Sequence, residues 1–153
     1  MKKKRLFVLD LDHTLIYGSY APSESAKLLF QYNEYLKVYE RPYARELIEL
    51  VQSKGDVIVF TTAKRDYAER TIQELGIRAI TLYARDECKE TISGYKKKLP
   101  SKYSEQYDSI RIIDDDPGVW MENDVLEFLK PSEFLGDLLD KGLVILLNRL
   151  QGL

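Results

Sequence analysis

Three short apolar runs that each stop at a polar residue constrain the fold of this 153-residue chain more than any other feature. The runs and the residues that end them are 6–9 with Asp10, 57–60 with Thr61 and 110–113 with Asp114. Nearly continuous apolar runs of this length are typical of strands that helices bury on both faces. Because ligands bind beyond the carboxyl ends of such parallel strands, the three polar residues mark the expected site.

Helical patterns separate these runs, so the chain alternates between the two kinds of element. The expected helices cover residues 43–54, ending at Gly55, and a segment from Asp66 that closes at Gly76. Residues 79–83 and 125–129 are further expected strands, and the tail 134–150 is expected to be helical with a break at Gly142. This alternation predicts an α/β parallel sheet. Without repeats or a linker, residues 1–153 are expected to form one domain.

One cysteine and one histidine limit the chemistry available to the chain. They exclude an internal disulfide and a zinc site built from cysteine and histidine ligands. A metal would rest mainly on oxygen ligands, which favours Mg²⁺ or Ca²⁺. The net charge of −2 gives no global attraction to nucleic acid, and no apolar run approaches the roughly 20 residues of a membrane span. We therefore expect a cytoplasmic protein with no membrane partner, and the basic run 2–5 as a solvated strand start.

Acidic residues are concentrated at the ends of the first and third strands. Five carboxylates at one edge of a sheet repel one another, so they need a divalent cation and at least one lysine to stay ionised. Lysines are available at residues 96–98, and hydroxyl groups follow the second strand at Thr61 and Thr62. The five acids are Asp10, Asp12, Asp114, Asp115 and Asp116.

This set of residues suits phosphoryl transfer, which depends on positioning and charge neutralisation. One carboxylate can attack phosphorus, and a second can protonate the leaving oxygen and later deprotonate water. A threonine and a lysine can stabilise the phosphoryl oxygens. Each piece alone has a structural explanation, such as a turn, a helix cap or a solvated face. A response-regulator receiver uses similar residues, but its order along the chain differs from the Asp-x-Asp, Thr, Lys, acidic cluster found here.

These motifs resemble the haloacid-dehalogenase (HAD) superfamily, and within it the branch of RNA-polymerase-tail (CTD) and NIF-like phosphatases. The resemblance covers nearly the whole chain. It implies a three-layer α/β/α Rossmann-like fold that lacks a cap domain and carries a small flap or hairpin at about residues 16–41. The matching stretches are residues 8–15, the Arg-Pro pair in 38–42, 60–63 followed by Tyr67, 83–88, 94–99 and 112–117.

The resemblance also implies a role for each matching residue. Asp10 corresponds to the nucleophile and Asp12 to the general acid and base. Thr61 and Thr62 correspond to phosphate-binding positions, and Lys97 to the family lysine. The Mg²⁺ ligands would be Asp10, the Asp12 carbonyl and Asp115, with Asp114 in support.

The chain departs from the branch's pattern at three positions. His13 replaces the usual Glu, Asp116 replaces a Ser or Thr, and Lys98 replaces an Asp. The last departure leaves Lys96 and Lys98 as alternatives for the site lysine. Six of the 11 tyrosines fall between Tyr17 and Tyr43, where they either pack on a half-exposed sheet or form a platform for a substrate.

The resulting hypothesis is a monomeric, Mg²⁺-dependent phosphatase that cleaves phosphomonoesters through an aspartyl phosphate. Without a cap domain, its open site suits a bulky phosphorylated substrate such as a phosphoprotein. A nucleic-acid end or a small molecule is the alternative substrate. A module that binds phospho-ligands without turnover is the alternative of another class.

Overall fold

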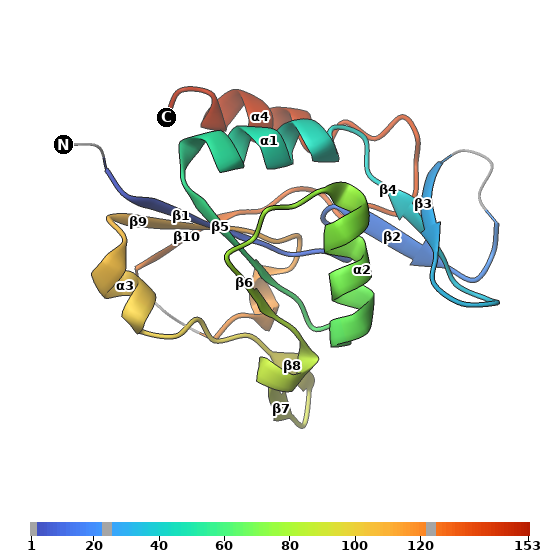
Figure 1. Ribbon diagram of the computed structural model, residues 1–153, viewed down its shortest axis with the longest axis horizontal. Helices are drawn as coiled ribbons and strands as arrows, with labels where there is room; N and C mark the ends of the chain where they lie inside the picture. The colour runs from blue at the N-terminus through green and yellow to red at the C-terminus, as the bar shows by residue number, and fades with distance from the viewer. Residues whose placement is uncertain (1–2, 23–25, 122–124) are drawn as a thin grey trace.

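A computed structural model describes residues 3–22, 26–121 and 125–153 (Figure 1), so Lys2 of the basic run lies outside the described residues. Five parallel strands form the central sheet, in the order β10-β9-β1-β5-β6. Their bounds are β1 Arg5–Leu9, β5 Asp56–Phe60, β6 Thr81–Tyr83, β9 Ser109–Ile113 and β10 Leu126–Leu129. All five expected strands are confirmed, and the two at the sheet edges are shorter than the apolar runs.

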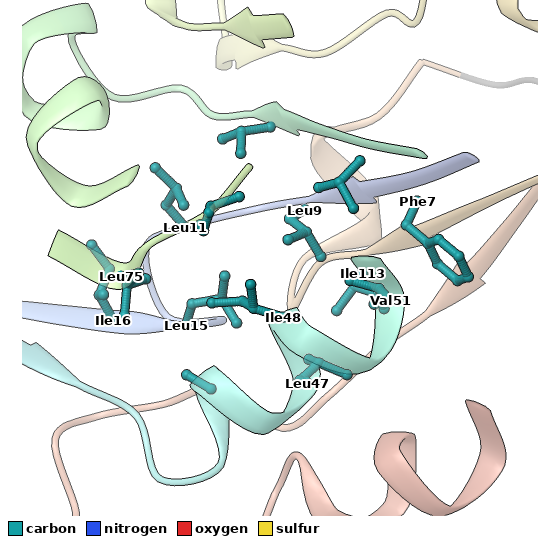
Figure 2. Close-up of a cluster of buried hydrophobic side chains, with 14 of the residues drawn as sticks. Phe7, Leu9, Leu11, Leu15, Ile16, Leu47, Ile48, Val51, Leu75 and Ile113 are labelled. Carbon is teal, nitrogen blue, oxygen red and sulfur yellow. The ribbon is translucent and has the colours of Figure 1, made fainter. Parts of the chain in front are cut away.

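Alternate residues of the central strands face opposite layers, as the two-residue period of a strand requires. Phe7 and Leu9 join the cluster that packs under α1 Ala44–Lys54, α2 Arg65–Leu75 and α4 Val144–Leu150 (Figure 2). Leu6 and Val8 face the second cluster, with α3 Lys102–Gln106. Helices therefore cover both faces, and the three-layer fold is confirmed.

The segment between β1 and α1 forms a small antiparallel sheet beside the main one (Figure 1). Its strands are β2 Ile16–Ser19, β3 Lys27–Gln31 and β4 Lys37–Glu40, in the order β2-β4-β3. We call residues 16–40 the flap; its residues 23–25 lie outside the described part of the chain. A hairpin of β7 Lys89–Thr91 and β8 Gly94–Lys96 and two short 3₁₀ turns, η1 Arg85–Glu87 and η2 Pro117–Val119, complete the element list.

The helix expected over residues 134–150 is wrong for its first half, because α4 begins only at Val144. Residues 130–143 follow an extended and turning path whose backbone pairs with the loop after β1: the Phe134 amide donates to the His13 carbonyl at 2.8 Å. The apolar spacing misled because Leu138 and Leu139 are exposed, whereas Phe134 is buried. Tertiary contacts, rather than helical periodicity, determine this segment.

Gly55 and Gly76 end α1 and α2 as expected, but with different backbone conformations. Gly76 is left-handed, with φ 70°, and ends α2 as expected. Gly55 is extended instead, and a β-carbon there would collide with the Arg5 carbonyl oxygen. At Gly142 a β-carbon would collide with the guanidinium of Arg41. These two positions need glycine for close approach.

Within the described residues, no helix combines the length and apolar character that a membrane crossing requires.

Candidate active site

The candidate site lies where the direction of strand order reverses. From β1 the chain continues to the neighbouring β5 and β6, and it returns on the other side of β1 as β9. Asp10, Thr61 and Asp114 follow β1, β5 and β9 at the same edge of the sheet. A cavity of about 360 Å³ opens there. It is lined by Asp10, Asp12, His13, Thr62, Lys97, Asp114, Asp115, Asp116, Val119, Lys130 and Glu133.

Lys97 is the lysine that reaches the carboxylates. It follows β8 and is held by two backbone bonds, from its amide to the Val119 carbonyl and from the Met121 amide to its own carbonyl. Its ammonium donates to Asp10 Oδ1 at 2.9 Å and to Asp114 Oδ2 at 2.8 Å. Burial lowers the pKa of Lys97, but the charges of Asp10 and Asp114 outweigh that effect, so the pKa is raised.

The alternatives Lys96 and Lys98 do not line the cavity in the structure. The Lys96 ammonium donates to the Gly118 carbonyl at 2.9 Å, and Lys98 is exposed. Side chains alternate along an extended segment, so only the middle lysine of the three points into the core.

Thr14 is a site residue that no sequence motif singled out for a role. Its hydroxyl donates to Asp10 Oδ2 at 2.7 Å and lies 3.1 Å from Asp115 Oδ1, while the Asp115 amide donates to its oxygen at 3.0 Å. Lys97 and Thr14 thus fix the two oxygens of Asp10 separately. The available signal was its place four residues after Asp10, in the turn between β1 and β2.

Asp114 is buried and held by three donors. Its Oδ2 accepts from the Trp120 indole at 2.9 Å as well as from Lys97, and its Oδ1 accepts from the Asp116 amide at 2.9 Å. Burial, followed by the charge of Asp10, raises the pKa of Asp114 to about 6. Trp120 was not predicted as a site residue, and only the fold brings its indole to this carboxylate.

Three carboxylates form a group that fits a metal ion. One oxygen from each of Asp10, Asp114 and Asp115 lies within 4.8 Å of the others. Burial is the main cause that raises the pKa of Asp10 and Asp115, because the charged form loses water. One lysine balances only one of these three charges. An all-oxygen set with excess negative charge is what Mg²⁺ binds, so these side chains fit the expected cofactor.

Asp12 is not one of these three clustered carboxylates. Its Oδ1 accepts from the Tyr67 hydroxyl at 3.0 Å, and its side chain lines the cavity. Burial raises the pKa of Asp12, and the Tyr67 bond partly opposes that shift. The next residue, His13, is left-handed with φ 65°, so the chain turns sharply between Asp12 and Thr14. Two carboxylates that are two residues apart therefore have different surroundings.

The two threonines after β5 have different positions. Thr61 is buried and does not line the cavity, and its hydroxyl oxygen accepts from the Ala63 amide at 3.1 Å. Thr62 lines the cavity, and its carbonyl accepts from Arg85 Nε at 2.9 Å. Neither caps α2, whose N-cap residue is Lys64.

A second cavity of about 480 Å³ lies between the flap and the start of α2. It shares Asp12, His13 and Thr62 with the first cavity, and its other lining residues are Gly18, Tyr20, Tyr32, Asn33, Leu36, Ala63, Lys64, Tyr67 and Arg85. The tyrosines of the flap differ in their surroundings. Tyr39 is buried, whereas Tyr20 and Tyr32 line this cavity and Tyr20 is 79% exposed.

Arg41 stabilises the loop after β1 through hydrogen bonds from its guanidinium. Its buried guanidinium donates to the Thr14 carbonyl at 3.0 Å, to Ser132 Oγ at 3.1 Å and to Asp140 Oδ1 at 2.8 Å. The loop that carries Asp10, Asp12 and Thr14 is thus tied to residues 130–143. The Arg-Pro pair in the sequence indicated this position, but not its partners.

Comparisons with known proteins agree with this geometry. The sequence model of the NLI interacting factor-like phosphatase family matches residues 5–153, so the chain belongs to that family. This confirms the resemblance to the CTD-phosphatase branch of the HAD superfamily.

Two curated relatives are similar over most of this chain. A phosphatase of the RNA polymerase II C-terminal domain from Caenorhabditis elegans is 27% identical over 148 residues, or 90% of this chain and 22% of the relative. A CTD small phosphatase-like protein 2 of Dictyostelium discoideum is 30% identical over 119 residues, or 72% of this chain and 20% of the relative. The chain therefore spans only a minor part of these relatives.

Solved structures share the fold. The structure of Fcp1, an RNA polymerase II CTD phosphatase, superposes with a TM-score of 0.58 at 19% identity and covers 98% of this chain and 50% of the other. Fission yeast Fcp1 bound to beryllium fluoride gives a TM-score of 0.59 at 17% identity, covering 99% and 50%.

Proposed function

We propose that this protein is a Mg²⁺-dependent phosphatase that hydrolyses phosphomonoesters through an aspartyl phosphate on Asp10. The observation that carries the proposal is the arrangement of Asp10, whose oxygens are held by Lys97 and Thr14 beside two further carboxylates. Membership of a phosphatase family supports the same reaction.

The metal would be held by Asp10, Asp115 and the Asp12 carbonyl, with Asp114 in support. When bound, it would supply positive charge against the phosphoryl oxygens and the crowded carboxylates. Lys97 would keep Asp10 ionised and oriented, and Thr61 would donate its hydroxyl proton to a phosphoryl oxygen.

The reaction would proceed in two steps. An oxygen of Asp10 forms a bond to phosphorus as the bond from phosphorus to the leaving oxygen breaks, and Asp12 gives that oxygen a proton. Asp12 then takes a proton from water, whose oxygen attacks phosphorus and releases the Asp10 carboxylate together with phosphate. The raised pKa of Asp12 suits a group that must first donate a proton.

The substrate is proposed to be a phosphoprotein or another bulky phosphomonoester. Asp12 lines two cavities, and residues of the flap line only the second of them. The polymerase-tail phosphatases among the relatives support a macromolecular substrate.

The test is hydrolysis of p-nitrophenyl phosphate and of a phosphopeptide, with Mg²⁺ and with a chelator. Activity is expected only with Mg²⁺, and Asp10→Asn should abolish it, while Ser104→Ala, an exposed position remote from the cavity, serves as the matched control. Asp12→Asn should accumulate a phosphoenzyme that hydroxylamine cleaves. Substantial turnover by Asp10→Asn would refute the nucleophile, and phosphopeptide binding without any turnover would support the non-catalytic module.

A further inference from the structure

A cationic residue, Lys130, directly follows β10 at the edge of the sheet where the candidate site lies. Leu129 of β10 pairs with Ile113 of β9, so Lys130 follows β10 just as Asp114 follows β9. Lys130 lines the same cavity as Asp10. No motif singled out Lys130, because its position beside Asp114 depends on the pairing of two strands.

Lys130 differs from Lys97, the other lysine of this cavity, in its surroundings. Lys97 is buried and pairs with two carboxylates. Lys130 is exposed, and no hydrogen bond or ion pair within residues 3–22, 26–121 and 125–153 involves its ammonium. Its charge is therefore available to a ligand that enters the cavity.

Acidic residues of the same cavity restrict the kind of ligand that can bind at Lys130. Glu133 and Asp116 also line the cavity, and the Glu133 carboxylate lies 3.5 Å from His13 Nδ1. These acids disfavour an anion elsewhere on this wall, so Lys130 marks one narrow position where a negative group is favoured. The phosphoryl group itself belongs at Asp10, where Lys97 and Thr14 act.

We propose that Lys130 binds a second anionic group of the substrate, a carboxylate or a phosphate carried by the leaving group. This subsite lies on the β10 side of Asp10, within the cavity that both residues line. The inference rests on the proposed function and deepens it: the preferred substrate is a phosphomonoester with a further negative charge close to the scissile bond.

Three phosphoserine peptides that differ at one neighbouring residue test this subsite. That residue is glutamine, glutamate or a second phosphoserine, which separates the carboxylate from the phosphate as the source of charge. The readout is the ratio of kcat/KM for each charged peptide to that for the glutamine peptide, at every placement within two residues of the phosphoserine.

Wild type should prefer a charged peptide by about two- to fivefold, the range of an ion pair with a solvent-exposed lysine. Lys130→Ala should bring this ratio close to one, and Lys130→Glu should invert it. Lys98→Ala, which removes an exposed lysine outside the cavity, should keep the wild-type ratio. Added salt should reduce the preference. Equal ratios in wild type and Lys130→Ala at every placement would overturn the subsite.

A binding measurement separates this proposal from the proposed function. The same peptides are titrated into Asp10→Asn with and without Lys130→Ala, using the fluorescence of Trp120, the one tryptophan of the chain. If Lys130→Ala weakens the affinity for the charged peptides and leaves the affinity for the glutamine peptide unchanged, the subsite is supported even if no peptide is hydrolysed. Unchanged affinities overturn it even if the enzyme is active.

Discussion

Two buried cations, Lys97 and Arg41, lie on opposite sides of the loop after β1 and have different surroundings. Lys97 pairs with two carboxylates that also line a cavity. Arg41 pairs with the single carboxylate of Asp140, and its other donors are satisfied by carbonyls and a hydroxyl. Around Arg41 the charges balance, whereas around Lys97 the acids are in excess.

Burial of an ion pair therefore does not by itself mark an active site. A balanced and saturated pair such as Arg41 with Asp140 fixes the chain path. The group formed by Lys97 and its acids faces a cavity and keeps a net negative charge, which favours the binding of a further cation. Variants of Lys97 and of Arg41 test this difference.

The largest effect is expected for Lys97→Met. Loss of this cation should lower kcat by about 10²–10³-fold, the range for removing one preorganised electrostatic group. The variant should also be less stable than wild type, because Asp10 and Asp114 are left buried without it. Mg²⁺ should recover much of that stability, measured by urea unfolding with and without the ion, since it neutralises the same carboxylates. A stability loss that Mg²⁺ does not change would contradict the contrast.

Arg41→Met should lower the free energy of unfolding by about 3–5 kcal/mol, because Asp140 and two backbone carbonyls lose their partner. Mg²⁺ should not restore this loss, since no part of the Arg41 group belongs to the candidate metal cluster. The measurement is the same urea titration. Arg45→Met removes an exposed arginine from the buried Glu40, which keeps Lys27 as a partner, so this variant should cost less than about 1 kcal/mol.

The stability of the metal-free protein should depend on Asp114. Its pKa is raised from 3.8 to about 6 on folding, so its contribution is fully present below pH 3.8 and is lost as the pH rises through 6. Two pKa units correspond to about 3 kcal/mol. Asp114→Asn should remove this part of the pH dependence, as measured by unfolding in a chelator from pH 4 to 7. Parallel curves for the two proteins would contradict the assignment.

The smallest effect is expected for Tyr67→Phe. It removes the hydrogen bond to Asp12 and should lower kcat by about three- to tenfold, the value of one net hydrogen bond. Tyr32→Phe loses a bond to Asp66 at the rim of the second cavity and should change kcat for p-nitrophenyl phosphate much less. Equal losses in both variants would contradict a specific role for the hydrogen bond from Tyr67 to Asp12.

Much of the fold could be predicted because the central strands carry their own signal. The runs ending at Asp10, Thr61 and Asp114 are apolar on both faces, and only a covered parallel sheet buries them. The tail was mispredicted because spaced leucines resemble a helix. In the tail, the backbone hydrogen bond from Phe134 to His13 and the hydrogen bonds that Arg41 donates determine the path of the chain.

The sheet, the family and the acidic residues of the site could be predicted from the sequence, because they depend on local runs and on motifs within single segments. The pairing of Lys97 with Asp10, the hydrogen bonds from Thr14 and Trp120 to the carboxylates, and the position of Lys130 beside Asp114 follow only from the folded chain. These contacts join segments up to about 100 residues apart. Their geometry follows from strand order and register, which no local pattern specifies.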